Sequence, residues 1–291
     1  MVATEPGAPG LPRRNWFLRQ RFLLLRRITQ FTLLGLFLSG PWYGIWILKG
    51  NLASSVFLDA LAFTDPYIYL QSVVSGHDMG ELAGIGAATI LVFYLVVGGR
   101  AYCSWVCPIN VVTDTAFWLR SKLGLSLSWQ PKKNIRLWLL LMTLVVSALT
   151  SSIAWELVNP ITMLQRGFVF GMGLAWAIVL AVFLFDLIVS RRGWCSHLCP
   201  VGAFYGLLGN GSLLRVSAAN RQACTDCGDC FRVCPEPHVI TDPLLGEEKG
   251  IKPLILSGDC TNCGRCIDVC DDDVFHFATR FETRLVNNKE A

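Results

Sequence analysis

Eight of the twelve cysteines in this chain fall into two runs near its C-terminal end, and both runs have the same spacing. The first run contains Cys224, Cys227, Cys230 and Cys234, and the second contains Cys260, Cys263, Cys266 and Cys270. Zinc sites often combine two CxxC pairs, whereas this longer run is typical of bacterial ferredoxins. In those proteins the fourth cysteine of each run binds the other cluster, which predicts two crossed [4Fe–4S] sites.

The crossing rule divides the eight cysteines into two sets of four, the usual number of thiolates on a cubane. Cluster 1 is expected on Cys224, Cys227, Cys230 and Cys270. Cluster 2 is expected on Cys260, Cys263, Cys266 and Cys234. Clusters of this kind relay single electrons, so the C-terminal part of the chain is predicted to be an electron-transfer domain.

The other four cysteines form two CxxxCP pairs, Cys103 with Cys107 and Cys195 with Cys199. Cysteines four residues apart lie on one face of a helix, so each pair can present two sulfurs together. If the pairs meet, their thiolates could bind a third iron–sulfur cluster or another metal. The alternatives are redox-active or partner-contacting thiols and a plain structural role. A stable disulfide is not expected in a reducing compartment.

Four apolar segments are long enough to cross a bilayer, which takes about 20 residues. They lie near residues 28–48, 82–98, 137–157 and 168–189. Charged residues are confined to their ends, which argues against the core helices of a soluble protein. Of the 291 residues, 53% are hydrophobic and 16% are charged. No basic face with interleaved aromatic residues points to nucleic acid.

Lys and Arg residues gather on one side of the predicted helices. Six arginines precede the first segment, and six basic residues lie between the second and third segments. The two outer loops contain only Lys49 and Arg166. The positive-inside rule therefore predicts a protein of the bacterial inner membrane with both termini in the cytoplasm. The C-terminal cysteines would then lie where thiols stay reduced.

The membrane half contains an internal repeat. Asp65-Pro66-x-x-x-Leu70-Gln71 and Asn159-Pro160-x-x-x-Leu164-Gln165 lie in the outer loops, and each precedes an apolar segment and a CxxxCP pair. Two helix pairs of the same orientation should be related by an axis along the membrane normal. Gln71, His77 and Gln165 are candidates for lining a quinone site. The plainer interpretation is that they are helix-start or solvated loop residues.

These features together predict an all-α transmembrane domain of four helices, made of two parallel two-helix repeats, followed by an α+β ferredoxin domain with two [4Fe–4S] clusters. The expected boundaries are 1–27 for a basic cytoplasmic segment, 28–215 for the membrane domain and 216–291 for the cytoplasmic ferredoxin domain.

The order of these motifs resembles the NapH family, the membrane ferredoxin subunits of bacterial periplasmic nitrate reductase systems. The resemblance covers nearly the whole chain and rests on Leu38-Ser39-Gly40-Pro41-Trp42, Cys103-Ser104-Trp105-Val106-Cys107-Pro108 and Val233-Cys234-Pro235-Glu236-Pro237-His238. It implies a quinol dehydrogenase subunit that takes electrons from membrane quinol together with a ferredoxin partner similar to NapG. The electrons would then pass toward a periplasmic cytochrome or nitrate reductase.

Two other functions stay open at this point. Related membrane ferredoxins with CxxxCP pairs occur in maturation systems for nitrous-oxide reductase and cytochrome oxidase, where they reduce metal or cofactor sites in other proteins. The chain would then be an assembly factor, which should bind copper or a maturation partner. A non-catalytic membrane anchor for a ferredoxin partner is the other alternative, and it should keep its partner after loss of the cubanes.

Overall fold

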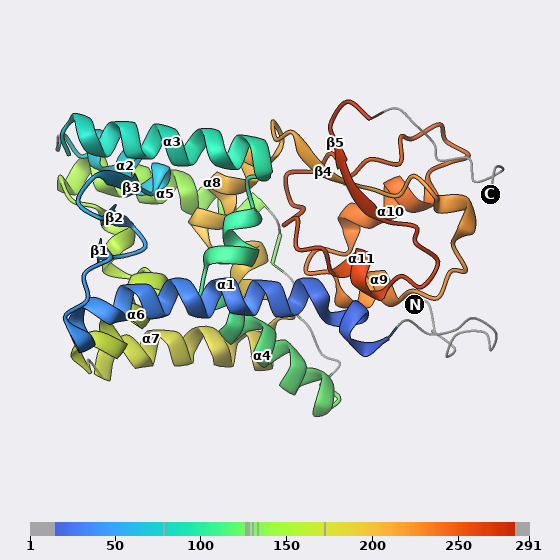
Figure 1. The fold of residues 1–291 in the computed structure, drawn as a ribbon, viewed down its shortest axis with the longest axis horizontal. Coiled ribbons are helices and arrows are strands. Elements are labelled where there is room, and N and C mark those ends of the chain that lie inside the picture. The colour runs from blue at the N-terminus through green and yellow to red at the C-terminus, as the bar shows by residue number, and fades with distance from the viewer. Residues whose placement is uncertain are drawn as a thin grey trace.

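The structure, a computed structural model, describes residues 15–77, 79–125, 129, 131–132, 134–171 and 173–282. The first 14 residues of the predicted basic segment, and Lys133 of the basic loop, lie outside the described residues. The molecule has two parts, a helical half and a C-terminal part that covers one end of the helices (Figure 1).

The helical half is built mainly from helices of different length. In chain order its elements are α1 (Trp16–Tyr43), β1 (Leu48–Gly50), β2 (Ser54–Phe57), β3 (Leu61–Thr64), α2 (Pro66–Val74), α3 (Glu81–Val97), η1 (Tyr102–Val106), α4 (Ile109–Lys122), α5 (Asn134–Thr150), η2 (Ala154–Leu157), α6 (Pro160–Phe170), α7 (Gly173–Leu184), η3 (Phe185–Val189), η4 (Trp194–Leu198) and α8 (Pro200–Gly209). Both CxxxC stretches, η1 and η4, are short π-helical turns.

Helix α1 begins at Trp16, well before the predicted apolar segment at 28–48. Its first turns carry arginines that pair with acids of the C-terminal part, with Arg19 at 3.3 Å from Asp229 and Arg21 at 3.3 Å from Asp268. These ion pairs stabilise a charged first part of the helix, which lies against the C-terminal part of the chain. The helix ends at Tyr43, because Gly44 has a φ of +72° and caps it.

The first outer loop contains a sheet, so the prediction of an all-α membrane half is wrong for residues 48–64. Strands β1, β2 and β3 are antiparallel and adjacent in chain order, with Leu48 opposite Phe57 and Ser54 opposite Thr64. Leu58 and Asp59 lie in the connection between β2 and β3, and both are left-handed, with φ values of 49° and 58°. The β-branched and aromatic residues in this segment favour strands. Its sequence has no helical periodicity that would favour a helix instead.

The internal repeat appears as two copies of one element order. Helices α2, α3, η1 and α4 correspond to α6, α7, η4 and α8. Each copy starts with a capped half-helix, in which Asp65 accepts from the Tyr67 N–H at 2.8 Å and Asn159 from the Ile161 N–H at 3.1 Å. A proline in the first turn of each half-helix suits a position that needs no backbone donor.

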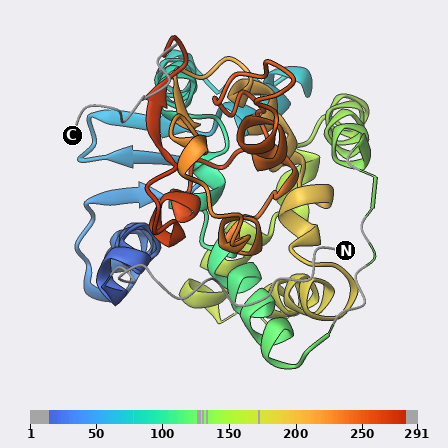
Figure 2. The same cartoon turned by 90° about the vertical axis from the view of Figure 1, so that its right-hand side faces the viewer.

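Helices α1, α3, α5 and α7 run along the long axis of the molecule and are seen nearly end-on in Figure 2. Each exposes large apolar side chains, for example Phe31, Phe93, Trp138 and Leu180. Among the described helices, α1 alone is long and apolar enough to cross a bilayer by itself, and Glu81–Val97, Asn134–Thr150 and Gly173–Val189 are shorter apolar helices.

Two of the predicted segments end at other places than expected. Helix α5 ends at Thr150 rather than near residue 157, because the chain then turns through η2 toward the cap of α6. The segment predicted at 168–189 is divided between α6 and α7, because Gly171 is left-handed with a φ of +63° and ends α6. The capped half-helix α6 thus takes residues 168–170 from the last expected span.

The C-terminal part is an α+β unit. Its elements are β4 (Leu214–Ser217), η5 (Arg221–Ala223), α9 (Asp229–Val233), α10 (His238–Leu245), α11 (Arg265–Val269) and β5 (His276–Thr279). Strands β4 and β5 are antiparallel, with Val216 opposite Phe277. Short helices α9 and α11 each follow a left-handed glycine, Gly228 and Gly264, and their apolar sides join one core with Ile240 and Ile255.

The two parts approach closely where α8 meets the loop before Cys260. An added Cβ at Gly258 would overlap the carbonyl oxygen of Gly206, and one at Gly209 would lie 2.9 Å from the carbonyl oxygen of Gly258. Glycine is therefore needed on both sides of this junction.

Gly258→Ala is expected to lower the free energy of unfolding by about 1–3 kcal/mol, because the backbone of α8 must move to admit the methyl group. The measurement is thermal unfolding of the purified chain in detergent. Gly211→Ala is the matched control, since its Cβ would meet its nearest atoms at 3.6 Å, an ordinary contact. Equal unfolding temperatures for the two variants would contradict the close junction.

Candidate functional site

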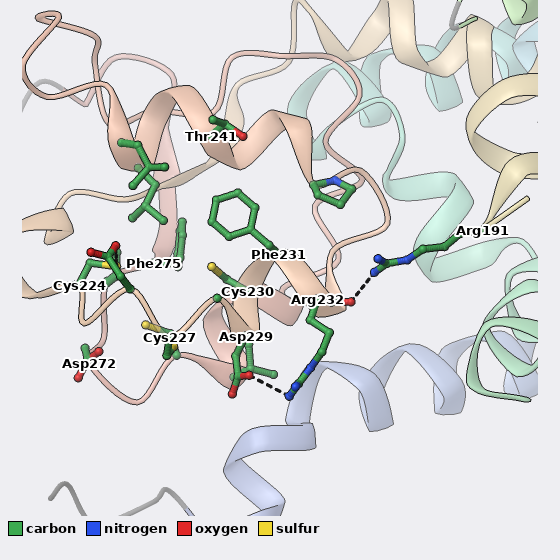
Figure 3. A pocket seen from close by; sticks show the side chains of 18 residues that line it. Arg191, Cys224, Cys227, Asp229, Cys230, Phe231, Arg232, Thr241, Asp272 and Phe275 are labelled. Carbon is green, nitrogen blue, oxygen red and sulfur yellow. Dashed lines mark hydrogen bonds and ion pairs between the residues drawn. The ribbon is translucent and has the colours of Figure 1, made fainter. Parts of the chain in front are cut away.

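The first cysteine cavity lies in the C-terminal part, and Arg191 of the helical half also lines it. It is an open cavity of about 760 Å³ whose cysteines are Cys224, Cys227, Cys230 and Cys270. Figure 3 shows three of these sulfurs beside the rings of Phe231 and Phe275, with Arg232 paired to Asp229 at the rim. Cys227 is exposed and Cys230 is buried. The cavity thus combines three cysteines of the first run with the last of the second.

The second cysteine cavity is enclosed and lies nearer the helical half. Its cysteines are Cys234, Cys260, Cys263 and Cys266, and its apolar lining includes Val216, Ile240 and Ile255. Cys263 and Cys266 are buried. Cys230 of the first cavity and Cys266 of the second belong to one buried core, so the two cavities are neighbours. The last cysteine of the first run therefore joins three of the second.

The third cysteine cavity lies inside the helical half, where the two repeats meet. It is lined by Cys103, Cys107, Cys195 and Cys199, together with apolar residues that include Trp155, Ile161 and Val201. The structure therefore brings the two CxxxCP pairs together. The volume of this cavity is about 20 Å³, the same as that of the second cavity.

Burial governs the protonation of the thiols in the third cavity. Burial, together with the nearby Cys103 sulfur, raises the pKa of Cys199 to about 12, although the backbone N–H groups of Gly202 and Val201 act in the opposite direction. These N–H groups belong to the first turn of α8, where the helix dipole favours negative charge. A free thiol here would stay neutral, whereas a coordinating thiol is deprotonated outright.

The predicted quinone-site residues serve structural contacts and line none of the three cysteine cavities. Gln71 is fully buried, and its side-chain oxygen accepts from the Ser147 hydroxyl at 3.1 Å and from the backbone N–H of Trp155 at 3.2 Å. The Gln165 amide donates to the Gly50 carbonyl at 3.2 Å. His77 lies 3.2 Å from the Ser75 hydroxyl. A quinone role for these three residues stays a prediction.

A buried charge network, which the sequence analysis missed, joins the two parts of the molecule. Arg100 donates to Glu236 at 2.8 Å, and Arg136 pairs with Asp259. Burial alone would raise the pKa of Asp259, but hydrogen bonds from His238 and Arg136 hold that pKa well below its usual range. The sequence contains one sign of this network. Arg100 and Arg192 each lie three residues before the first cysteine of a CxxxCP pair.

Comparison with known protein families agrees with these cysteine sites. The model described as a 4Fe-4S binding domain matches residues 80–126 and again residues 170–216, which are the two CxxxCP repeats. The model described as a 4Fe-4S dicluster domain matches residues 216–271. No solved structure matches the fold. The chain is thus an iron–sulfur electron-transfer protein of the ferredoxin type.

Comparison with individual proteins narrows this class. The chain is 59% identical to the methylamine utilization ferredoxin-type protein MauN of Paracoccus denitrificans over 92% of the chain and 94% of that protein. It is 47% identical to the ferredoxin-type protein NapH of Escherichia coli over 96% of each. This chain belongs to the family of ferredoxin-type proteins that contains MauN and NapH. The resemblance to NapH is confirmed, and MauN is an addition to it.

Proposed function

We propose that this chain is the membrane subunit of a quinol-oxidising complex and passes single electrons through three iron–sulfur sites. The observation that carries the proposal is the succession of three cysteine quartets, from the interior of the helical half to the exposed end of the C-terminal part. A quinol releases two electrons and two protons. An iron–sulfur site takes one electron at a time, so the quartets can divide a two-electron oxidation into single steps.

The first and second cavities are proposed to hold clusters 1 and 2. Cys224, Cys227, Cys230 and Cys270 would hold cluster 1, and Cys260, Cys263, Cys266 and Cys234 would hold cluster 2. Four thiols facing one space, with apolar walls around them, are the donor set that a [4Fe–4S] cluster needs. The match of residues 216–271 to a dicluster domain supports this assignment.

The third cavity is proposed to hold a further [4Fe–4S] cluster on Cys103, Cys107, Cys195 and Cys199. Three observations support it: the four sulfurs line one cavity, that cavity is as large as the one proposed for cluster 2, and both repeats match a 4Fe-4S binding domain. The N-terminal turns of α4 and α8, which begin within two residues of Cys107 and Cys199, favour the negative charge of thiolates.

The helical half is proposed to lie in the bacterial inner membrane, with α1, α3, α5 and α7 across the lipid and both termini in the cytoplasm. The exposed apolar side chains on all four helices support this arrangement. The excess of Lys and Arg on the side of the C-terminal part supports the orientation. The six arginines before residue 28 include Arg13 and Arg14, which lie outside the described residues.

The redox system served by the chain is proposed from the names of its relatives. NapH points to nitrate reduction, with a NapG-like ferredoxin as partner and a periplasmic cytochrome or reductase as electron acceptor. MauN is described by its role in methylamine utilization. Both relatives are described as ferredoxin-type proteins, which fits an iron–sulfur subunit that exchanges single electrons.

Quinol oxidation is tested by mixing the anaerobically purified chain, in detergent, with menaquinol and ubiquinol analogues. We expect the visible absorbance of the oxidised clusters to bleach and a reduced-cluster EPR signal to appear. The matched control is the oxidised quinone, which should leave the spectrum unchanged. If dithionite reduces the clusters but neither quinol does, the quinol assignment is wrong, and an electron supply from another protein takes its place.

A further inference from the structure

Arg100 lies between the third and second cysteine cavities. Its side chain is 1% exposed, and it donates to Glu236 at 2.8 Å, to the Asp259 carbonyl at 3.0 Å and to the Cys195 carbonyl at 3.0 Å. Asp259 directly precedes Cys260 of the second cavity, and Cys195 belongs to the third. One guanidinium therefore bonds to the main chain beside both sets of cysteines.

The first CxxxCP segment faces the Cys260 loop through two further hydrogen bonds. Ser104 donates to the Thr261 carbonyl at 2.7 Å, and the Trp105 indole donates to the Asn262 carbonyl at 3.1 Å. Together with Arg100, these bonds engage three of the carbonyls that surround Cys260. Hydrogen bonds of this kind fix a loop in register and also link its atoms to those of its neighbour.

The second repeat contacts the chain segment that leads to Cys234, the other segment that supplies a cysteine to the second cavity. Arg191 donates to the Arg232 carbonyl at 2.6 Å, and Arg192 donates to the Val233 carbonyl at 3.4 Å. Val233 directly precedes Cys234, the single cysteine that the first run contributes to this cavity. Each repeat thus holds one of the two chain segments that supply cysteines to the second cavity.

The electrostatics of Arg100 fit a fixed positive charge between two sites that gain negative charge. Arg100 is paired with the Glu236 carboxylate at 2.8 Å, which offsets the cost of burying its charge. Arginine stays charged under these conditions, unlike lysine, which loses its proton readily when buried. A positive charge beside a site stabilises its reduced form, because reduction adds an electron there.

The same carboxylates do not make a separate metal site. Atoms of Glu236, His238 and Asp259 lie within 4.8 Å of one another. Both carboxylates are already paired with guanidinium groups, those of Arg100 and Arg136. A cation placed there would have to displace these two positive charges. The network is better described as a structural link between the two parts of the chain.

We propose that electrons pass directly between the CxxxCP site and the site of Cys234, Cys260, Cys263 and Cys266, and that Arg100 is the positioning residue for this step. The inference rests on the proposed function, since it requires a redox site at the CxxxCP cysteines. In each event one electron leaves one site and enters the other, and no bond or proton is transferred. The site of Cys224, Cys227, Cys230 and Cys270 then follows as the exit toward a partner.

The test compares Arg100→Gln, Arg100→Lys and Arg120→Gln in the full chain, purified anaerobically in detergent. Arg120 is the control, because it is also buried and its hydrogen bonds to the Asp186 and Leu187 carbonyls lie within the helical half. Iron content is measured first. Reduction potentials are then measured by EPR titration, and the rate of electron transfer between sites by freeze-quench EPR after mixing with a reductant.

The Arg100→Gln variant is expected to keep its iron. The equilibrium constant for reduction of the adjacent sites should fall at least tenfold, which is equivalent to about 59 mV for one electron. Electron transfer between the two sites should also slow at least tenfold. Arg100→Lys keeps a charge but not the planar fork, so its potentials should approach those of the parent while transfer stays slow. Arg120→Gln should match the parent in both. If Arg100→Gln loses iron, the lysine variant and Ser104→Ala carry the test, because both preserve the charges.

Unchanged potentials and rates in Arg100→Gln with full iron content would overturn the inference, and so would an equal effect of Arg120→Gln. Unchanged rates in both Arg100→Lys and Ser104→Ala would also overturn it. The failure of the proposed function looks different. In that case Cys103→Ser with Cys195→Ser leaves both the iron content of the chain and its reduction by quinol unchanged, and no redox site exists for Arg100 to connect.

Discussion

Replacing Cys103 and Cys195 together by serine is expected to remove about four iron atoms per chain, with the matching acid-labile sulfide. A serine hydroxyl stays protonated near neutral pH and is a poor ligand for iron. Both cysteines line the cavity in which the repeats meet, so the double variant removes one ligand from each pair. Cys107 and Cys199 cannot hold a cubane alone.

The same variant should slow the reduction of clusters 1 and 2 by quinol more than about 100-fold, which exceeds the usual effect of residues that only support a ligand. Dithionite should still reduce these clusters, because it reaches them without the CxxxCP site. Ser196→Ala is the control, since it lies in the same segment, is buried and contributes no sulfur.

Three outcomes distinguish the roles of these four cysteines. Loss of iron with loss of quinol reactivity supports a third cluster. Unchanged iron with lost reactivity would remove the cluster and leave redox-active thiols, which thiol titration of the parent would count. Unchanged iron and unchanged reactivity would leave a structural role only, and the route of electrons from the membrane would then need another site.

Replacing Cys270 by serine is expected to abolish the same spectroscopic component as replacing Cys224, although these cysteines belong to different runs. Both line the open cavity at the exposed end of the C-terminal part. Replacing Cys234 should in turn reproduce the loss seen with Cys260, because these two line the enclosed cavity. Each variant should lose its cubane or convert it to a three-iron form.

EPR spectra of the reduced single variants provide the comparison, with iron content as the second measurement. The pairs serve as each other's matched controls, since all four changes are the same substitution in one small unit. If Cys270→Ser instead gives the spectrum of Cys260→Ser, each run holds its own cluster and the crossed assignment is wrong. Quinol-driven reduction should then be measured in both pairs, because loss of cluster 2 alone is expected to isolate cluster 1 from the membrane.

Several features of the molecule follow from local sequence. The 2-2-3 spacing of cysteines is set by a short loop around three corners of a cubane, and it needs no knowledge of distant residues. The half-helices after Asp65 and Asn159 follow from cap and proline chemistry within a few residues. The repeat and the resemblance to NapH also depend on ordered local motifs, which is why the comparisons confirm that family.

Other features depend on contacts between distant residues. The sheet at 48–64 forms because its three strands pair with one another. The composition of each strand alone does not decide between a strand and a loop. The start of α1 at Trp16 depends on acids such as Asp229 and Asp268, more than 200 residues away. Single-sequence periodicity contains neither type of information.

The cysteine quartets with which the sequence analysis began show the same division. Spacing by itself determined that the chain carries ferredoxin-type cysteines and two CxxxCP pairs. The tertiary structure alone decided that the pairs share a cavity and that Arg100 joins this cavity to the Cys260 loop. Arg100 and Asp259 are 159 residues apart, and only packing of the C-terminal part on the repeats buries them together, where a charge must find its partner.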